Sequence, residues 1–435
     1  MKTEKPIAVL AGARTPLCKS FTDLSDESAV SLGTHAVKAA IESANQKSES
    51  FTAEHVEELV MGNVAGPPDA ANISRVIALS AGLPKDRIAH TVNRNCASGM
   101  ESILSAWDAI QNGRASVVVS GGTESMSQIP LLFHPDAARL WLQLARGKTI
   151  TQKLRTIASL RPRHFKPVMG VQLGLTDPVS GLNMGETAEV LAKEFAISRD
   201  DQDEYALLSH RRASEARERC FLSGEIAEFT TAQGKAISKD NGPRVDQSLA
   251  QLAKLKPIFD RSGTVTAGNS CPLSDGAAAL VLCDPITAQQ FGDPLGYITE
   301  YAVAGCDPHR MGLGPIYAIA KLLSKSKRSM RDFDLVELNE AFAAQVIACE
   351  RAAESKSFAK NELGLDQPLG RISRDTMNLH GGAIALGHPV GMTGTRLVLT
   401  LLRALRESGK RRGLATLCVG GGQGVAMIVQ THLEE

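Results

Sequence analysis

TVNRNCASGMESIL, residues 91–104, sets a cysteine among small and polar residues immediately before a helical pattern. The apolar residues behind Cys96 recur at helical spacing: Ile103, Leu104, Trp107 and Ile110. This pattern predicts a helix that begins just after Cys96. The free N–H groups and the positive end of a helix can lower a thiol pKa from about 8.5 to roughly 3.5–7.5. We therefore interpret Cys96 as a candidate nucleophile, with a buried, inert cysteine as the alternative.

The composition excludes several classes of protein. The chain has 435 residues, 43% of them hydrophobic, which allows two or three domains or one duplicated architecture. Its eight cysteines include no C-x-x-C pair, so neither zinc nor a disulfide framework is indicated, and a reducing compartment fits best. A net charge of +1 gives no reason to expect nucleic acid. Because no apolar run could span a membrane and the start does not read as a signal peptide, we predict a cytoplasmic protein.

The order of predicted elements repeats along the chain. Strand-like runs alternate with helical patterns and predict α/β layers around a largely buried sheet: PIAVLAG, EELVMGN, SVVVSGG, AALVLCD, FDLVELN and LATLCVGG. In the first half a helix over 29–44 precedes EELVMGN, the Cys96 helix and SVVVSGG. In the second half a helix over 315–325 precedes FDLVELN, then His388 ahead of a helix over 395–406, then LATLCVGG. We predict two copies of one unit whose packing brings both helix starts together, with chance similarity as the alternative.

An insertion separates the halves. Residues 127–250 form the predicted loop domain, the first half takes 1–126 and 251–286, and the second takes 287–435. From 137 to 176 this insertion has no Asp or Glu, but it has many basic residues: Arg139, Arg146, Lys148, Lys153, Arg155, Arg161, Arg163 and Lys166. Interleaved leucines predict an amphipathic basic helix that could bind anionic lipid, a partner or a polyphosphate, unless it is simply a solvated face.

Three further segments indicate a site. NLHGGAIALGHPVGMTGTR, residues 378–396, surrounds His388 with small residues that allow close approach of a ligand. LCVGGGQGVAMIV, residues 417–429, places Cys418 at a strand end before a glycine turn into another strand, which predicts a hairpin and not a dinucleotide site. LNEAFAAQ predicts a helix that begins with Asn339 and Glu340. Two cysteines, a histidine and an amide together indicate acyl transfer through sulfur.

Five of these motifs occur in one order that resembles the thiolases over nearly the whole chain: NCASGMES, TVTAGNSCPLSDGAAA, LNEAFAAQ, GGAIALGHPVGMTGTR and CVGGGQG. The resemblance implies two similar βαβαβαββ halves in five layers, with a loop domain inserted in the first half. It also implies an acyltransferase that cleaves 3-ketoacyl-CoA with CoA, or runs the reverse Claisen condensation.

The resemblance also implies roles for individual residues. Cys96 would carry the acyl group as a thioester, His388 would activate it, and Cys418 would transfer the second proton. The backbone N–H groups of Cys96 and Gly420 would form one oxyanion site. His388 and a water held by Asn339 would form the other. CoA would enter as a substrate, with no metal and no bound cofactor.

Some positions depart from the family pattern. Cys271 stands where a small Ser commonly contacts CoA, so we assign CoA contact to Cys271 and Met184 only provisionally. The basic insertion resembles that of the β subunit of fatty-acid β-oxidation complexes, whereas Asn339 is the more general thiolase choice. We favour a degradative 3-ketoacyl-CoA thiolase over an acetoacetyl-CoA thiolase, with a ketoacyl synthase or a noncatalytic lipid- or partner-binding scaffold less favoured.

The resemblance extends to partners. It implies a homodimer or a tetramer. The basic segment over 137–166 separately predicts docking of either a hydratase/dehydrogenase partner subunit or a membrane surface. Acyl-chain length and preferred direction are not set by the sequence.

Overall fold

The computed structural model describes residues 5–433, which form two compact units. Ile129–Thr176 is one unit, and the remainder of the described chain is the other. The predicted boundaries of the halves and of the insertion at 127–250 stay a prediction. Among the described residues, no helix is long and apolar enough to cross a membrane.

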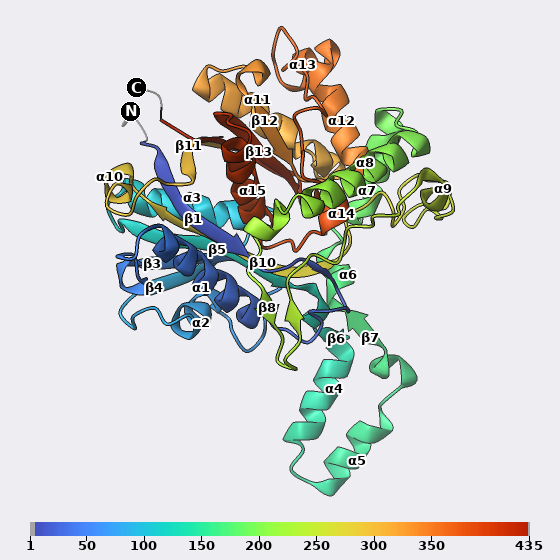
Figure 1. The fold of residues 1–435 in the computed structure, drawn as a ribbon. Coiled ribbons are helices and arrows are strands. Elements are labelled where there is room, and N and C mark those ends of the chain that lie inside the picture. The colour runs from blue at the N-terminus through green and yellow to red at the C-terminus, as the bar shows by residue number, and fades with distance from the viewer. Residues whose placement is uncertain (1–4, 434–435) are drawn as a thin grey trace. The chain divides into compact units, whose positions relative to one another are not determined.

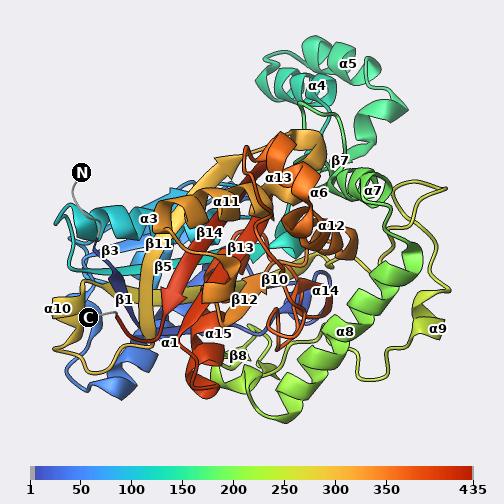
Figure 2. The ribbon, with the colours of Figure 1, turned by 90° about the horizontal axis from the view of Figure 1, so that it is seen from above.

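The main unit is built on one continuous sheet (Figures 1 and 2). The first half contributes β1 (Ile7–Arg14), β2 (Cys18–Lys19), β3 (Glu58–Gly62), β4 (Ile88–Val92), β5 (Val117–Ser125) and β10 (Ser274–Cys283). The second half contributes β11 (Gly296–Gly305), β12 (Leu335–Leu338), β13 (Arg412–Val419) and β14 (Gln423–Gln430). The strand order is β12-β13-β14-β11-β1-β10-β5-β3-β4, with β2 paired beside β10. A separate pair is formed by β8 (Phe229–Thr230) and β9 (Ala236–Ile237).

The pairing pattern confirms the predicted duplication. β3 runs parallel to β5, and β12 runs parallel to β13. β10 is antiparallel to both β5 and β1, just as β14 is antiparallel to both β13 and β11. The halves join where β1 and β11 pair antiparallel, with Ile7 opposite Ile298. Beyond this shared set, β4 extends the first half by one strand.

The helices complete five layers. The first half has α1 (Ala29–Lys47), α2 (Ile73–Ser80) and α3 (Ser98–Gln111). The second has α11 (Gly314–Ser326), α12 (Ala343–Glu354), α13 (Lys356–Glu362), α14 (Ala383–Leu386) and α15 (Thr393–Glu407). α7 (Met184–Glu194), α8 (Arg199–Glu218), α9 (Leu249–Leu252) and α10 (Pro285–Ala288) connect them. α1 covers β1, β5 and β10, and α11 covers β11 and β14 (Figure 1). α3 and α15 contact each other; α3 packs on β3 and β5 of the first half, and α15 contacts strands of both halves. The predicted helices over 29–44, 315–325 and 395–406 are confirmed.

Helix α15 is buried on nearly every side, although four of its buried residues are polar: Thr393, Thr395, Arg396 and Thr400. Its buried leucines and valine are at most 1% exposed: Leu397, Val398, Leu399, Leu401, Leu402 and Leu405. Burying each contributes roughly 1.5–3 kcal/mol. Arg396 is also buried and forms an ion pair with Glu337 of β12 at 2.9 Å. Burial raises the pKa of Glu337 to about 8 against the pull of Arg396. Losing Glu337 would leave the buried guanidinium of Arg396 without a counter-charge, which costs about 3–5 kcal/mol.

The small unit consists of short helices and one two-stranded sheet. It comprises β6 (Leu131–Phe133), α4 (Pro135–Arg146), α5 (Ile150–Ala158), β7 (Pro167–Met169) and α6 (Gly170–Gly174). β6 and β7 pair antiparallel, and Trp141 packs its ring near those of Phe133 and Phe165, at centroid distances of 6.4 and 6.1 Å. The helix predicted in the basic stretch is thus confirmed, as α4 and α5.

Candidate active site

The starts of α3 and α15 meet at backbone distance. A Cβ on Gly99 would lie 2.8 Å from both the N and Oγ1 atoms of Thr395, and one on Gly394 would lie 2.5 Å from Met100 N. The Thr395 hydroxyl donates to the Gly99 carbonyl at 3.1 Å. Glycine is required at both contacts because any side chain would hold the helices apart. The predicted convergence of the two helix starts is confirmed, and the segments that carry Cys96 and His388 lead into them.

Cys96 lies two residues before the start of α3, with Ala97 between them, and is half-buried. Burial raises its pKa, while the backbone N–H groups of Gly420 and of Cys96 itself hydrogen-bond the sulfur and act in the opposite direction. The expectation of a lowered pKa is wrong, because desolvation of the thiolate outweighs these donors. The same two N–H groups, one from each half of the fold, nevertheless converge on one atom.

His388 is oriented by a short hydrogen-bond chain. Its Nδ1 lies 2.7 Å from Thr393 Oγ1, which donates its own proton to the Pro389 carbonyl at 2.9 Å. A hydroxyl has one proton, so Thr393 must accept from Nδ1–H, which leaves Nε2 with its lone pair. Burial, with a smaller effect from Arg396, lowers the pKa of His388 to about 3. The imidazole is therefore neutral near pH 7 and able to accept a proton at Nε2.

Asn339 reaches the same imidazole from the end of β12. Its Nδ2 lies 3.5 Å from His388 Nε2, and its backbone N–H donates to Thr416 O at 3.0 Å. The side chain is fully buried, and among the described residues its Oδ1 has no hydrogen-bond partner. A buried acceptor without a protein partner is uncommon and marks a place where a small polar group would bind.

Glu340 does not begin a helix with Asn339, so that prediction is wrong. α12 begins at Ala343, and the Glu340 carboxylate turns into the core. There it accepts hydrogen bonds from Tyr205 Oη at 3.1 Å and Ser209 Oγ at 2.6 Å. Asn378 Nδ2 donates a third at 2.9 Å. These donors, from α8 and from the segment before His388, hold the Glu340 carboxylate in the core ahead of α12.

Two more cysteines lie close to Cys96. Cys418, near the end of β13, is 2% exposed, and burial raises its pKa well above the usual value, with further increases from Cys96, Cys349 and Cys271. Burial likewise raises the pKa of Cys271 to about 12, and Cys96 adds to the shift. Cys271 N–H donates to Ala341 O at 3.0 Å, which ties its loop to the segment after Asn339. The structure thus brings both predicted thiols, Cys418 and Cys271, within electrostatic range of Cys96.

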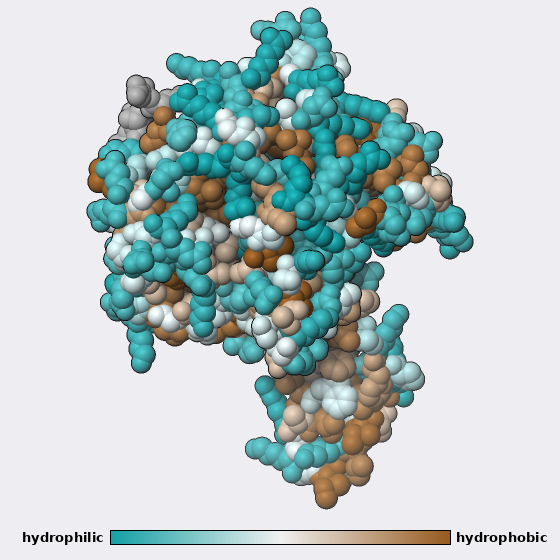
Figure 3. Space-filling view, viewed as in Figure 1, coloured by the Kyte–Doolittle hydropathy of each residue, from teal (hydrophilic) through white to brown (hydrophobic). Residues whose placement is uncertain are grey.

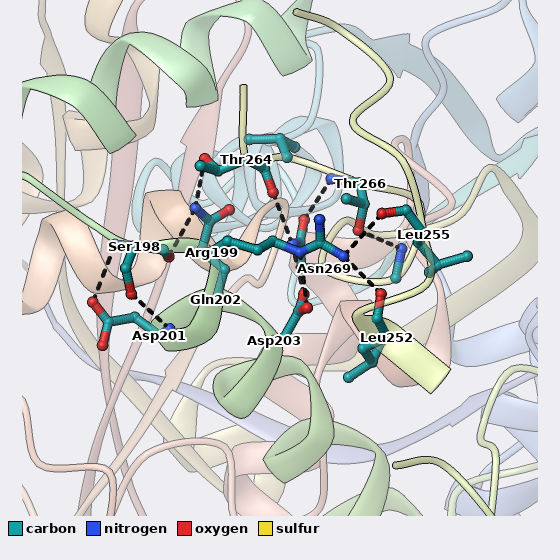
Figure 4. A network of polar contacts seen from close by, with 12 residues as sticks. Ser198, Arg199, Asp201, Gln202, Asp203, Leu252, Leu255, Thr264, Thr266 and Asn269 are labelled. Carbon is teal, nitrogen blue, oxygen red and sulfur yellow. Dashed lines mark hydrogen bonds and ion pairs between the residues drawn. The ribbon is translucent and has the colours of Figure 1, made fainter. Parts of the chain in front are cut away.

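The loop that carries Cys271 is held by α8, as Figure 4 shows. Asn269 Nδ2 donates to Asp203 Oδ1 at 2.9 Å, and Asn269 Oδ1 accepts from Thr266 N at 2.7 Å. Arg199 Nε pairs with the other Asp203 oxygen at 2.8 Å. These anchoring residues were missed in the sequence, since nothing in the α8 pattern distinguishes them from an ordinary charged helix face.

The glycine turn after Cys418 is the predicted hairpin. Gly421 and Gly422 have φ of 89° and 81°, and Gly422 N–H donates to Val419 O at 3.2 Å. A Cβ on Gly420 would lie 3.2 Å from Met184 Sδ, so Met184 lies against this turn. Glu124, which the motifs did not identify, accepts hydrogen bonds from the N–H groups of Val64, Ala65 and Gly391, and so fixes the loop that follows His388.

A duplicated, layered α/β fold with a cysteine, a neutral histidine and a second thiol at the junction of its halves defines an acyl-transferring enzyme. The chain matches the family model of the thiolase N-terminal domain over residues 7–285 and that of the C-terminal domain over 292–431. It belongs to the thiolase family and is thereby an acyltransferase.

Individual relatives agree with this assignment. The 3-ketoacyl-CoA thiolase of Photorhabdus laumondii subsp. laumondii is 38% identical over 431 residues, 98% of this chain and 97% of that protein. The crystal structure of the Bacillus anthracis acetyl-CoA acetyltransferase is 35% identical, with a TM-score of 0.85, and covers 99% of this chain and 100% of that one. Human mitochondrial 3-ketoacyl-CoA thiolase in complex with CoA is also 35% identical, with a TM-score of 0.84 and 99% of each chain covered.

Proposed function

We propose that the protein is a 3-ketoacyl-CoA thiolase that cleaves 3-ketoacyl-CoA with CoA in fatty-acid β-oxidation. The observation that carries the proposal is the convergence on Cys96 of the Gly420 N–H, its own N–H and a second thiol, Cys418. Relatives named 3-ketoacyl-CoA thiolase, at 38% and 36% identity, support the degradative direction. CoA acts as a substrate, as the CoA complex of the human relative supports, and we propose no metal and no resident cofactor.

In the first step the Cys96 proton passes to His388 Nε2 and the sulfur attacks the keto carbon of the substrate. The bond between C2 and C3 then breaks, its electron pair stays on C2 of the departing acetyl-CoA, and Cys418 protonates that carbon. In the second step the CoA thiol gives its proton to Cys418 and attacks the Cys96 thioester. Departure of the shortened acyl-CoA leaves the Cys96 thiolate, to which His388 returns the proton.

Two sites stabilise the negative charge that develops on oxygen. The N–H groups of Cys96 and Gly420 serve the oxygen of the Cys96 thioester, and losing one such donor costs on the order of 3 kcal/mol in the barrier. His388 and a water bound to Asn339 serve the thioester oxygen of acetyl-CoA. The unpartnered, buried Oδ1 of Asn339 supports this role because it can accept a hydrogen bond from that water.

The second candidate is an acetyl-CoA C-acetyltransferase that makes acetoacetyl-CoA by Claisen condensation. The 35% identity to the Bacillus anthracis enzyme of that name, at a TM-score of 0.85, favours keeping it. Both reactions use the same residues, so the distinction lies in the acyl group that the site accepts.

One kinetic series tests both candidates. We expect kcat/KM to be higher for long 3-ketoacyl-CoA substrates than for acetoacetyl-CoA, and Cys96→Ser to lose activity with all of them. Cys220→Ser, which changes an exposed cysteine on another part of the surface, is the matched control and should keep full activity. Full activity of Cys96→Ser would overturn the thiolase mechanism, whereas turnover of acetoacetyl-CoA alone would favour the second candidate.

We also propose that the protein is a homodimer joined along β4. This strand ends the sheet, so one row of its backbone hydrogen-bonding groups has no neighbouring strand in the described chain. Ile88 on β4 is 53% exposed, and Leu79 at the end of α2 is 45% exposed. Sedimentation at micromolar concentration should give a dimer or a dimer of dimers, and Ile88→Lys should shift it toward monomer. A monomeric wild-type protein would refute this assembly.

The small unit is proposed to bind anionic membranes through 137–166. Apolar residues gather on its surface, as Figure 3 shows, with Ile150 77% exposed on α5 beside exposed basic side chains. Vesicles containing anionic lipid should bind the whole protein at low salt and release it at high salt. Deletion of 137–166 should abolish this binding. If the deletion leaves flotation unchanged and instead weakens copurification with a hydratase/dehydrogenase, the segment is a docking site for that subunit.

A further inference from the structure

The two residues before the nucleophile both contact the glycine hairpin of the other half. Asn95 Nδ2 donates to the Gly420 carbonyl at 2.8 Å, and Arg94 Nη1 donates to Gln423 Oε1 at 2.9 Å. The residue that follows them is Cys96, and the N–H of Gly420 faces its sulfur. The turn that leads into the nucleophile is therefore joined to the hairpin by two direct hydrogen bonds.

The conformation of Asn95 directs its side chain to this contact. Asn95 has a φ of 46°, a left-handed conformation that Asn tolerates better than most residues. The turn is closed by Ala97 N–H donating to Arg94 O at 3.0 Å and Ser98 N–H donating to Asn95 O at 3.0 Å. A Cβ on Gly420 or on Gly421 would lie 3.9 Å from Asn95 Nδ2, so the amide spans the base of the hairpin turn.

The hairpin needs such a restraint because three glycines in succession are free to rotate. On the N-terminal side, the pairing of Val419 with Gln423 fixes the strand register. On the C-terminal side, Gly422 O accepts from Cys306 N at 2.8 Å. Between these two points the hydrogen bond from Asn95 fixes the carbonyl of Gly420, and so limits rotation of the residue whose N–H serves the sulfur.

We propose that Asn95 is a positioning residue of the thiolase reaction, which holds Gly420 so that its N–H stays directed at the Cys96 sulfur. The inference rests on the proposed function, because the oxygen that Gly420 stabilises arises only in acyl transfer to Cys96. Arg94 lies in the same turn, but its guanidinium also forms an ion pair with Glu101, with Nε 2.6 Å from Oε2. Asn95 is therefore the residue to test.

Three substitutions separate positioning from turn shape. Asn95→Gly keeps the left-handed backbone but removes the donor, and should lower kcat about fivefold with KM changed less than twofold, as the loss of one hydrogen bond predicts. Asn95→Asp keeps size and conformation but sets a carboxylate against the Gly420 carbonyl, and should lower kcat further, at least tenfold. Asn95→Ala adds backbone strain to the lost donor and should also lower the melting temperature.

Asn93→Asp is the matched control for charge. Asn93 is exposed, and its Asp variant keeps the oxygen that accepts from Asn95 N–H at 2.9 Å while losing the longer, exposed hydrogen bond from Nδ2 to Val64 O at 3.3 Å. It should retain near wild-type kcat. Wild-type kcat in Asn95→Gly, or equal effects of Asn95→Asp and Asn93→Asp, would overturn the inference. Impairment of Asn95→Ala alone would show that the residue only shapes the turn.

A second readout keeps the inference separate from the proposed function. Because the Gly420 N–H stabilises the thiolate, Asn95→Gly and Asn95→Asp should slow alkylation of Cys96 by iodoacetamide at fixed pH, whether or not the protein cleaves ketoacyl-CoA. Inactive wild-type protein with slowed alkylation in the variants would refute the proposed function and retain the positioning contact. Unchanged alkylation together with an active wild-type enzyme would refute the contact alone.

Discussion

Gly99→Ala tests whether the close approach of α3 and α15 assembles the active site. The added Cβ would lie 2.8 Å from Thr395 N, 2.8 Å from Thr395 Oγ1 and 3.0 Å from Met392 O. Two of these atoms belong to the backbone at the start of α15, which cannot move without shifting the loop that carries His388. The strain therefore acts on the relative position of Cys96 and His388, whose segments lead into these two helices.

The expected change in the free energy of unfolding is the difference between a cost of overpacking and a gain in helix propensity. Overpacking a buried contact costs about 1–3 kcal/mol, and three contacts at or below 3.0 Å place this site near the upper end. Replacing Gly by Ala within a helix returns up to about 1 kcal/mol. We expect a net loss of roughly 2 kcal/mol in the free energy of unfolding. Because misplacing reacting groups by about 1 Å can cost on the order of 100-fold in rate, kcat/KM should fall by a similar factor.

Urea denaturation and steady-state kinetics measure the two effects on the same preparations. Gly66→Ala is the control, since its nearest neighbour would be Asn63 Oδ1 at 3.9 Å, and it should behave as wild type. Adding Thr395→Gly to Gly99→Ala removes one clashing atom and should recover part of the activity, a coupling that a double-mutant cycle quantifies. Unchanged stability and activity in Gly99→Ala would refute the argument that this backbone contact sets the geometry of the site.

Three further outcomes are expected. Thr393→Val should lower kcat by about 10- to 100-fold, because it leaves His388 Nδ1–H without its acceptor and frees the other tautomer; unchanged kcat would show that the tautomer is set elsewhere. Alkylation of Cys96 by iodoacetamide should rise about tenfold per pH unit between pH 7 and 8, because the raised pKa keeps the thiol mostly protonated; a plateau there would contradict it. Burial lowers the pKa of His210 and His380 to about 4 and of His388 to about 3. The unfolded chain binds these protons below about pH 6.5 and the folded chain does not, so stability should fall as pH drops from 6.5 to 4, on the order of 3 kcal/mol for each histidine. Urea midpoints that do not change over this range would contradict the prediction.

The sequence predicted the duplicated fold because apolar runs and helical spacing are local signals that repeat in one order. It placed the candidate site residues in motifs at strand ends and helix starts, and the structure confirms that the two helix starts behind Cys96 and His388 meet. The anchoring of Asn269 by Asp203, the tautomer set by Thr393 and the contact between Asn95 and Gly420 depend on partners distant in the chain. Spacing along the sequence carries no signal for such contacts, and a helix-start argument for the Cys96 pKa could not include the desolvation that the tertiary structure imposes.

The antiparallel junction of β1 with β11 has a consequence for how the enzyme comes into being. Each half supplies part of one reaction centre, so neither half is expected to be active by itself. A chain on the ribosome therefore cannot be active until β14 has been synthesised. Gln430, near the end of the described chain, pairs with Tyr297, and through this strand the hairpin that carries Cys418 and Gly420 joins the rest of the sheet. Acquisition of activity during refolding should therefore coincide with the latest long-range step, and a thiol that is buried and protonated in the finished protein would be most open to chemical damage before then.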